Sequence, residues 1–269
     1  MADDATTGAV KTKNPSPLVY DKEKNKECKF EEVTTNDEKN KDRDCRKTVI
    51  YVDKEGYIQN AEIKQKPISG LDHGHIDVIN AVVLHRTATS KTADIAFNGF
   101  AAGTGSQFII DNDGTIYQTA SLSTYAWHVG YIKPRCKDEN SCTPTDTKTL
   151  NDIYKIYRSK IKLAHTKEEK KAVNDEYYSS IHKYEIEKKY PIRYPYNGDA
   201  IGIEVVCLYV SDGNKGGSWN PVTAAQKKSV NKLVDILMNI YELSEGDIYG
   251  HDKISYKTAG EGDGLYGNS

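Results

Sequence analysis

The chain of 269 residues has no run of about 18 apolar residues, the length that a membrane-spanning helix needs. It also has no excess of basic charge, because 37 Lys and Arg stand against 39 Asp and Glu. This balance gives no electrostatic footprint for a nucleic acid. The N-terminus, Met1-Ala2-Asp3-Asp4, has neither the basic nor the apolar segment of a signal peptide. We therefore expect synthesis in the cytoplasm without a signal peptide, no membrane span and no nucleic-acid partner.

None of the five cysteines forms the Cys-x-x-Cys spacing of a structural zinc site. Cys28 and Cys45 flank a lysine-rich loop, and Cys136 and Cys142 flank a short polar one. Both pairs could close as disulfides in an oxidising compartment, which would leave Cys207 unpaired. Five free thiols in a reducing compartment fit the sequence equally well, so the redox state stays open.

Apolar residues are scarce in residues 1–46, which are rich in Lys, Asp, Glu and Asn. This composition predicts a polar N-terminal arm that is partly disordered. Residues 47–269 are expected to form one domain, interrupted at 131–197 by a segment of different character. There, apolar side chains such as Ile153, Ile156 and Tyr157 recur at helical spacing among many charges. We interpret 131–197 as an inserted hairpin of two helices that turns around Thr166.

The rest of the domain shows the patterns of strands and helices in alternation. The apolar, β-branched run 79–84 predicts a buried strand that ends at His85. A second buried strand is expected at 200–206, and Thr223 should cap a helix over 224–242. The remaining predictions are a strand at 48–52, a turn at 53–56, a strand at 57–59, a helix within 91–102 and a hairpin at 107–117.

Three residues of these segments are candidates for chemistry. His85 ends a buried strand, His251 follows the long helix, and Glu204 interrupts the apolar run Ile203-Glu204-Val205. A buried ionised carboxylate is costly unless it has a cation or a hydrogen-bond donor, or unless its pKa is raised. Each of the three residues alone is more often structural than functional. Their combination, with the motifs around them, indicates a site.

Five motifs together resemble the type 2 N-acetylmuramoyl-L-alanine amidases, a family that includes phage amidase-type lysozymes and peptidoglycan recognition proteins. The motifs occur in the family's order and cover residues 77–130 and 197–262. They are Leu84-His85-Arg86-Thr87-Ala88-Thr89, the hairpin from Gln107 to Ile116, Ala126-Trp127-His128-Val129-Gly130, Ile201-Gly202-Ile203-Glu204, and Gly250-His251-Asp252 with Lys257.

The resemblance implies an α/β fold, with a central mixed sheet flanked by helices and a Zn²⁺ ion in a surface cleft. It makes His85 and His251 the two histidine ligands, and neutral imidazole suits zinc. Glu204 matches the catalytic glutamate, which would move a proton from the attacking water to the leaving amine. Lys257 matches the residue that stabilises the developing oxyanion.

Residues of the cleft wall and the third ligand follow less directly. His128, Trp127 and Arg86 are expected to bind substrate. The family has its third ligand, Asp or Cys, two residues after the lysine, but Ala259 occupies that position here and cannot bind a metal. Glu261, ten residues beyond His251, is the first candidate to replace it, and Asp263 and His128 are the others.

The implied function is zinc-dependent hydrolysis of the amide bond between N-acetylmuramic acid and L-alanine in peptidoglycan. We expect an antibacterial effector of type VI-like secretion that acts in the periplasm of a target cell. Its partners would be peptidoglycan and an immunity protein or a component of the secretion apparatus. A peptidoglycan receptor without catalysis and a phage endolysin remain the alternatives.

Overall fold

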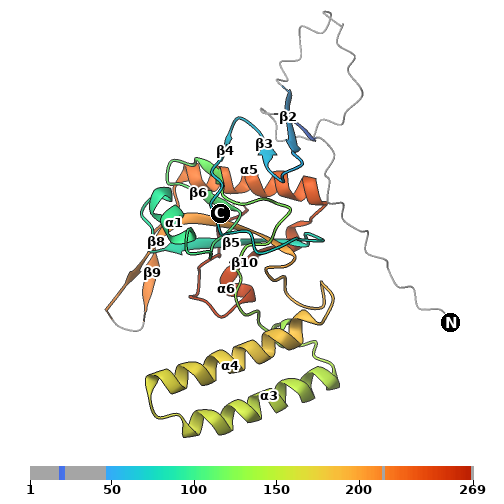
Figure 1. Cartoon of the computed structure of the whole chain (residues 1–269), viewed down its shortest axis with the longest axis vertical. Helices are drawn as coiled ribbons and strands as arrows, with labels where there is room; N and C mark the ends of the chain where they lie inside the picture. The colour runs from blue at the N-terminus through green and yellow to red at the C-terminus, as the bar shows by residue number, and fades with distance from the viewer. Residues whose placement is uncertain (1–17, 22–46, 214–215, 268–269) are drawn as a thin grey trace, which may run out of the picture.

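A computed structural model describes residues 18–21, 47–213 and 216–267 of the chain. Its centre is a seven-stranded mixed sheet of order β10-β5-β8-β6-β7-β4, with β9 paired to β8 (Figure 1). The pairs β6–β7 and β8–β9 are antiparallel, and the others are parallel. The strands are β4 (Ile63–Gln65), β5 (Ala81–Ala88), β6 (Phe108–Ile110), β7 (Ile116–Gln118), β8 (Ala200–Ser211), β9 (Gly217–Trp219) and β10 (Ile248–Gly250).

Helices cover both faces of this sheet, which confirms the predicted α/β class (Figure 1). The long helix α5 (Ala224–Tyr241) packs on one face, where Leu233 and Leu237 join Val82 and Leu84 in the main apolar core. Thr223 caps α5 with the predicted capping box. The other face carries α1 (Ala93–Phe100) and the short α6 (His251–Ile254), which follows the 3₁₀ turn η1 (Glu245–Asp247) and β10.

Side chains alternate between the two faces along the central strands. In β5, Val82 and Leu84 face α5, whereas Ala81 and Val83 belong to the apolar cluster on the opposite side. His85 continues the second set, so it lies on the face away from α5. The predicted strand end at His85 is wrong, because β5 stays paired with β8 beyond the histidine and continues to Ala88. Strand β8 continues to Ser211, where its last residues pair with β9.

A smaller antiparallel sheet contains β1 (Leu18–Asp21), β2 (Lys47–Val52) and β3 (Ile58–Gln59). Strands β2 and β3 confirm the predicted strands at 48–52 and 57–59. Apart from β1, the predicted polar arm lies outside the described residues. The same is true of Cys28 and Cys45.

Residues 131–197 contain the predicted helical hairpin, which extends from the sheet domain (Figure 1). After the short α2 (Arg135–Asp138), α3 (Pro144–Leu163) and α4 (Lys167–Ile186) run side by side. The turn between them contains Thr166, as predicted, and this residue also caps α4. Cys136 and Cys142, whose redox state the sequence left open, form a disulfide just before α3. None of the described helices has the length and apolar character needed to cross a membrane.

Candidate metal centre

Two neighbouring strands and the start of α6 bring the candidate residues together. His85 on β5 is the register partner of Glu204 on β8. On the other side of β5, Gly250 of β10 pairs with Leu84, so the next residue, His251, begins α6 beside His85. Both histidine side chains are buried. The adjacent strands therefore place two histidines and one carboxylate, which are far apart in sequence, at one end of the sheet.

Glu261 reaches this point from the loop after α6. Its Oε1 lies 2.7 Å from Nδ1 of His251 and 3.8 Å from Nδ1 of His85. The two Nδ1 atoms are 2.7 Å apart. Among the described residues, His85, His251 and Glu261 form a group whose ligand atoms all lie within 4.8 Å of one another. Of the three candidates for the third ligand, Glu261 is therefore the one that joins the two histidines.

The hydrogen bonds behind the histidines define which ring nitrogens carry protons. Nε2 of His251 lies 2.8 Å from the carbonyl oxygen of Val129, which can only accept, so this nitrogen carries the proton and Nδ1 has a free lone pair. For His128, Nε2 faces the carbonyl of Ala200 at 3.3 Å and Nδ1 faces Nε2 of His85 at 3.0 Å.

Burial and the neighbouring histidines lower the pKa of His128 well below its ordinary value, so its ring is neutral. With the proton of His128 on Nε2, its Nδ1 accepts from Nε2 of His85. The lone pair of His85 is then on Nδ1, which faces His251 and Glu261. His128 thus sets the tautomer of His85 from behind, as outer partners of metal-bound histidines do.

The donor set fits a divalent cation. Two nitrogen lone pairs and a carboxylate oxygen converge, and they repel one another unless a proton or a cation lies between them. Burial and the adjacent His251 lower the pKa of His85 to about 3, which disfavours a proton there. Burial would raise the pKa of Glu261, but the neighbouring side chains of His251 and His85 lower it to about 2. Two histidines and a carboxylate are a ligand set of catalytic zinc sites, in which a fourth position stays open.

Glu204 lies beside this group without being part of it. Its Oε2 is buried and has no hydrogen-bond partner among the described residues. Burial and the negative charge of Glu261 raise the pKa of Glu204 to about 8, whereas the charge of Lys257 acts in the opposite direction. A cation at the histidines would likewise favour the ionised form of this carboxyl group. Lys257 itself is exposed, on the segment that follows α6.

The three residues expected to bind substrate, Trp127, His128 and Arg86, lie in different surroundings. Trp127 is 48% exposed, and one face of its indole stacks on His73 with ring centroids 3.6 Å apart. His128 is only 7% exposed and lies behind His85. Arg86 turns its guanidinium to the backbone of the loop that carries Glu261.

Sequence reasoning missed two residues that shape the site. A Cβ atom at Gly202 would lie 2.8 Å from Nδ1 of His128, so only glycine lets this histidine pack against β8. A glycine inside an apolar strand is a known sign of such a close approach. Asp252 was noted only as part of a motif, but its carboxylate accepts from the backbone N–H groups of Gly260 and Gly262, on either side of Glu261.

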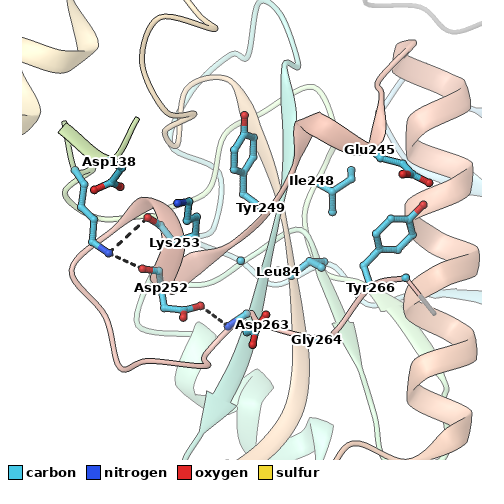
Figure 2. A pocket seen from close by; sticks show the side chains of 14 residues that line it. Leu84, Asp138, Glu245, Ile248, Tyr249, Asp252, Lys253, Asp263, Gly264 and Tyr266 are labelled. Carbon is cyan, nitrogen blue, oxygen red and sulfur yellow. Dashed lines mark hydrogen bonds between the residues drawn. The ribbon is translucent and has the colours of Figure 1, made fainter. Parts of the chain in front are cut away.

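A cavity of about 890 Å³ lies at the open edge of the sheet, beside β10 (Figure 2). Gly262 and Asp263 form part of its wall, together with Asp252. Its lining includes neither the three converging side chains nor Glu204. The cavity therefore lies next to the metal centre, on the other side of the Glu261 loop, and is separate from it.

A family description, N-acetylmuramoyl-L-alanine amidase, matches residues 76–263. The chain belongs to this family. It is an amidase, a hydrolase that acts on peptidoglycan in cell wall degradation. The matched range spans β5, β8 and the loop of Glu261, and also encloses the helical hairpin.

Solved structures with similar chains include amidases and endolysins. A selenomethionine derivative of AmpD is 16% identical, with a TM-score of 0.42 over 79% of this chain and 92% of that one. A mutant endolysin from Bacillus subtilis is 16% identical, with a TM-score of 0.38 over 71% and 84%. AmpDH3 from Pseudomonas aeruginosa, in complex with anhydromuramic pentapeptide, is 14% identical, with a TM-score of 0.41 over 69% and 55%. No curated protein sequence matches the chain significantly.

Proposed function

We propose that the chain is a zinc-dependent amidase that hydrolyses the bond between the lactyl group of N-acetylmuramic acid and L-alanine. The observation that carries this proposal is the convergence of three acceptor atoms, from His85, His251 and Glu261, next to the buried carboxyl group of Glu204. Two facing lone pairs and a carboxylate repel one another, and a cation bound between them would remove this repulsion.

His85, His251 and Glu261 would hold the ion. Zinc bound there would supply Lewis acidity, polarising the scissile carbonyl and making an attacking water molecule more acidic. Behind the ligands, Val129 and His128 keep the two imidazoles in the tautomers that the ion requires.

Glu204 would act as general base and then as general acid. Its carboxylate takes one proton from the attacking water, whose oxygen forms a new bond to the lactyl carbonyl carbon. The same proton then passes to the nitrogen of L-alanine as the C–N bond breaks. The second proton of the water leaves the new lactyl carboxylic acid for the released amine, so the products are a lactyl carboxylate and a stem peptide with a protonated free amino group. General acid–base catalysis of this kind typically contributes about 10²–10⁴-fold.

Two exposed side chains, those of Lys257 and Trp127, would contact the substrate. The charge of Lys257 lowers the pKa of both Glu204 and His85, and its ammonium group would stabilise negative charge at the scissile carbonyl. The free face of Trp127, held by His73, offers a flat apolar surface beside the centre. In this proposal residues 47–269 form the catalytic domain, and residues 131–197 are an insertion into it.

Product analysis tests the reaction. Purified protein with zinc should release stem peptides with free N-terminal L-alanine from sacculi, measured by mass spectrometry, without creating new reducing sugar ends. New reducing ends would mean a glycosidase, and free D-alanine would mean a peptidase. Binding to sacculi without any release, at every zinc concentration, would favour a receptor that does not cut.

We further propose that the amidase is an antibacterial effector delivered to the periplasm of a target cell. The helical hairpin supports this setting, since its exposed helices offer a docking surface for an immunity protein or for the secretion apparatus. Directing the chain to the periplasm of a Gram-negative host should cause lysis, and cytoplasmic expression should not. Rescue by the product of an adjacent gene that binds the chain would support an effector, whereas adjacent holin genes would identify an endolysin.

A further inference from the structure

We infer that Arg86 and Asp252 are positioning residues that hold the loop at 259–263 so that Glu261 faces the two histidines. The inference rests on the proposed function, because it treats Glu261 as the third metal ligand. It gives Arg86 a role different from the substrate contact expected from the sequence.

Arg86 holds the carbonyl groups of the loop. It follows His85 in β5, so its side chain leaves the strand on the opposite face from the histidine. Its Nη1 donates to the carbonyl oxygens of Gly260, of Glu261 at 3.2 Å and of Asp263 at 2.9 Å. A guanidinium group is always charged and rigid. Its three contacts to carbonyl groups therefore hold the backbone of the loop in a curve around Nη1 of Arg86.

Asp252 holds the N–H groups of the same loop from the other side. Its Oδ2 accepts from Gly260 N at 2.8 Å, and its Oδ1 accepts from Gly262 N at 2.9 Å. These two amides flank Glu261. In Figure 2 the carboxylate of Asp252 points to the backbone just before Asp263. Asp252 directly follows the ligand His251, so the two ligands are linked through one charged side chain.

Close packing fixes how near the loop lies to β5 and β10. A Cβ atom at Gly262 would run into the backbone of Gly250 and the carbonyl oxygen of Leu84, and glycine is therefore required there. Trp219 adds one more contact, because its Nε1 donates to the carbonyl of Ala259 at 2.9 Å. Protein contacts from several sides thus fix the shape of the loop.

This arrangement has an energetic consequence for metal binding. Ordering a free loop costs conformational entropy, and that cost would lower the affinity of a ligand on such a loop for the ion. A preorganised loop avoids the cost. Removing either charged side chain should therefore weaken zinc binding without touching a ligand, and outer-shell changes of this kind typically cost about 10–100-fold.

Zinc affinity of the full chain, measured by competition with a chromophoric chelator, tests the inference. Arg86→Met and Asp252→Asn should each bind zinc about 10–100-fold more weakly. Arg86→Lys, which keeps the charge but loses the planar fork, should fall between. Arg158→Met, on the exposed face of α3, is the matched control and should leave the affinity unchanged. Unchanged zinc affinity in Arg86→Met with a raised KM would overturn the inference and make Arg86 a substrate contact.

A double substitution separates positioning from general damage to the fold. Once Glu261→Ala has removed the ligand, adding Arg86→Met should weaken zinc binding no further. Independent, additive losses would overturn the inference. If Arg86→Met fails to fold, the same comparison of single and double substitutions is made with Asp252→Asn and Glu261→Ala. Absence of zinc binding by the unsubstituted protein would overturn the proposed function as well, whereas tight zinc binding by every variant would overturn only the positioning role.

Discussion

Around the metal centre the polar contacts are buried, whereas along the α3–α4 hairpin the ion pairs face solvent. His85 and His251 are tied to the backbone carbonyl of Val129 and, through His128, to that of Ala200. In the hairpin, Lys160 pairs with Glu176 and Lys171 with Asp175, but these side chains are about half exposed or more. Exposed pairs of this kind contribute about 0–1 kcal/mol. A single substitution should therefore disable the centre, while the hairpin should tolerate many.

The two regions meet at the base of the hairpin. Tyr178 of α4 packs on Tyr256, with ring centroids 4.2 Å apart, and His182 accepts from the backbone N–H of Ile132. Tyr256 follows α6, and Ile132 follows the segment of His128, so α4 rests on two segments that leave the centre. The hairpin is thus placed to affect how a large substrate reaches the site, without supplying a group to it.

The largest expected effect is the loss of the metal. His85→Ala or His251→Ala removes one of three ligands and should abolish zinc binding and activity together. Metal analysis after dialysis and peptide release from sacculi measure both. His165→Ala, at the exposed turn of the hairpin, is the matched control and should keep one zinc and full activity. Zinc retained at normal affinity in both ligand variants would contradict the site.

Glu204→Gln should separate chemistry from metal binding. The substitution keeps the shape of the side chain and removes its basicity, so turnover should fall about 10²–10⁴-fold while zinc affinity stays near normal. Glu187→Gln, exposed at the end of α4, provides the control. A near-normal rate in Glu204→Gln would show that another group moves the proton.

Replacing residues 137–192 by a short Gly/Ser linker, with Cys136→Ser, should leave a folded core that binds zinc. Activity on intact sacculi should fall more than activity on small soluble muropeptides, because the hairpin lies beside the centre and contributes no ligand. Equal losses on both substrates would mean that the hairpin supports the active site itself. No loss on either would leave it as a surface for a partner.

A smaller effect is expected from Asp146 at the base of the hairpin. A hydrogen bond from Lys188, together with those from Thr143 and Tyr184, lowers the pKa of Asp146 in the folded protein. A carboxyl group whose pKa falls on folding stabilises the fold above its unfolded pKa of about 4, and this contribution is lost as the pH falls through the folded value.

The hairpin base should therefore loosen in acid. Asp146→Asn removes the ionised carboxylate, so it should already loosen the base of the hairpin at pH 7. Acid below pH 4 should then cause no further loosening through this residue, because an amide does not titrate. Limited proteolysis at pH 7 and with pepsin near pH 3 compares the cleavage rates of α3 and α4. Asp152→Asn, exposed on α3, is the control. Equal cleavage of Asp146→Asn and the unsubstituted protein at pH 7 would contradict this role.

Many of the strands and helices could be predicted from the sequence, because local patterns of residues mark them. The β-branched runs predicted β5 and β8, and the Asp113-Gly114 turn predicted the β6–β7 hairpin. Thr223 marked the start of α5, and Thr166 marked the turn between α3 and α4. The ends of β5 and β8 were not predictable, because pairing with other strands extends them: β5 is extended along β8, and β8 is extended along β9.

The site was predicted as a set of residues and not as a geometry. Glu261 was one of three candidates, and the course of the loop, fixed by Arg86 and Asp252, brings it to the histidines. The position of His128 behind His85 depends on the absence of a side chain at Gly202, a contact between distant segments that has no periodic signature. Long-range contacts of this kind leave no local pattern in the sequence.

The most direct test of the central claim is a zinc titration of the metal-free protein, followed by amide hydrolysis on a soluble muropeptide. Activity should be absent after chelation and should return in proportion to added zinc, reaching its maximum at one ion per chain. The same titration of Glu204→Gln should bind one ion and restore almost no activity. Full activity of the protein after complete removal of metal would contradict the proposal that His85, His251 and Glu261 form the catalytic zinc site.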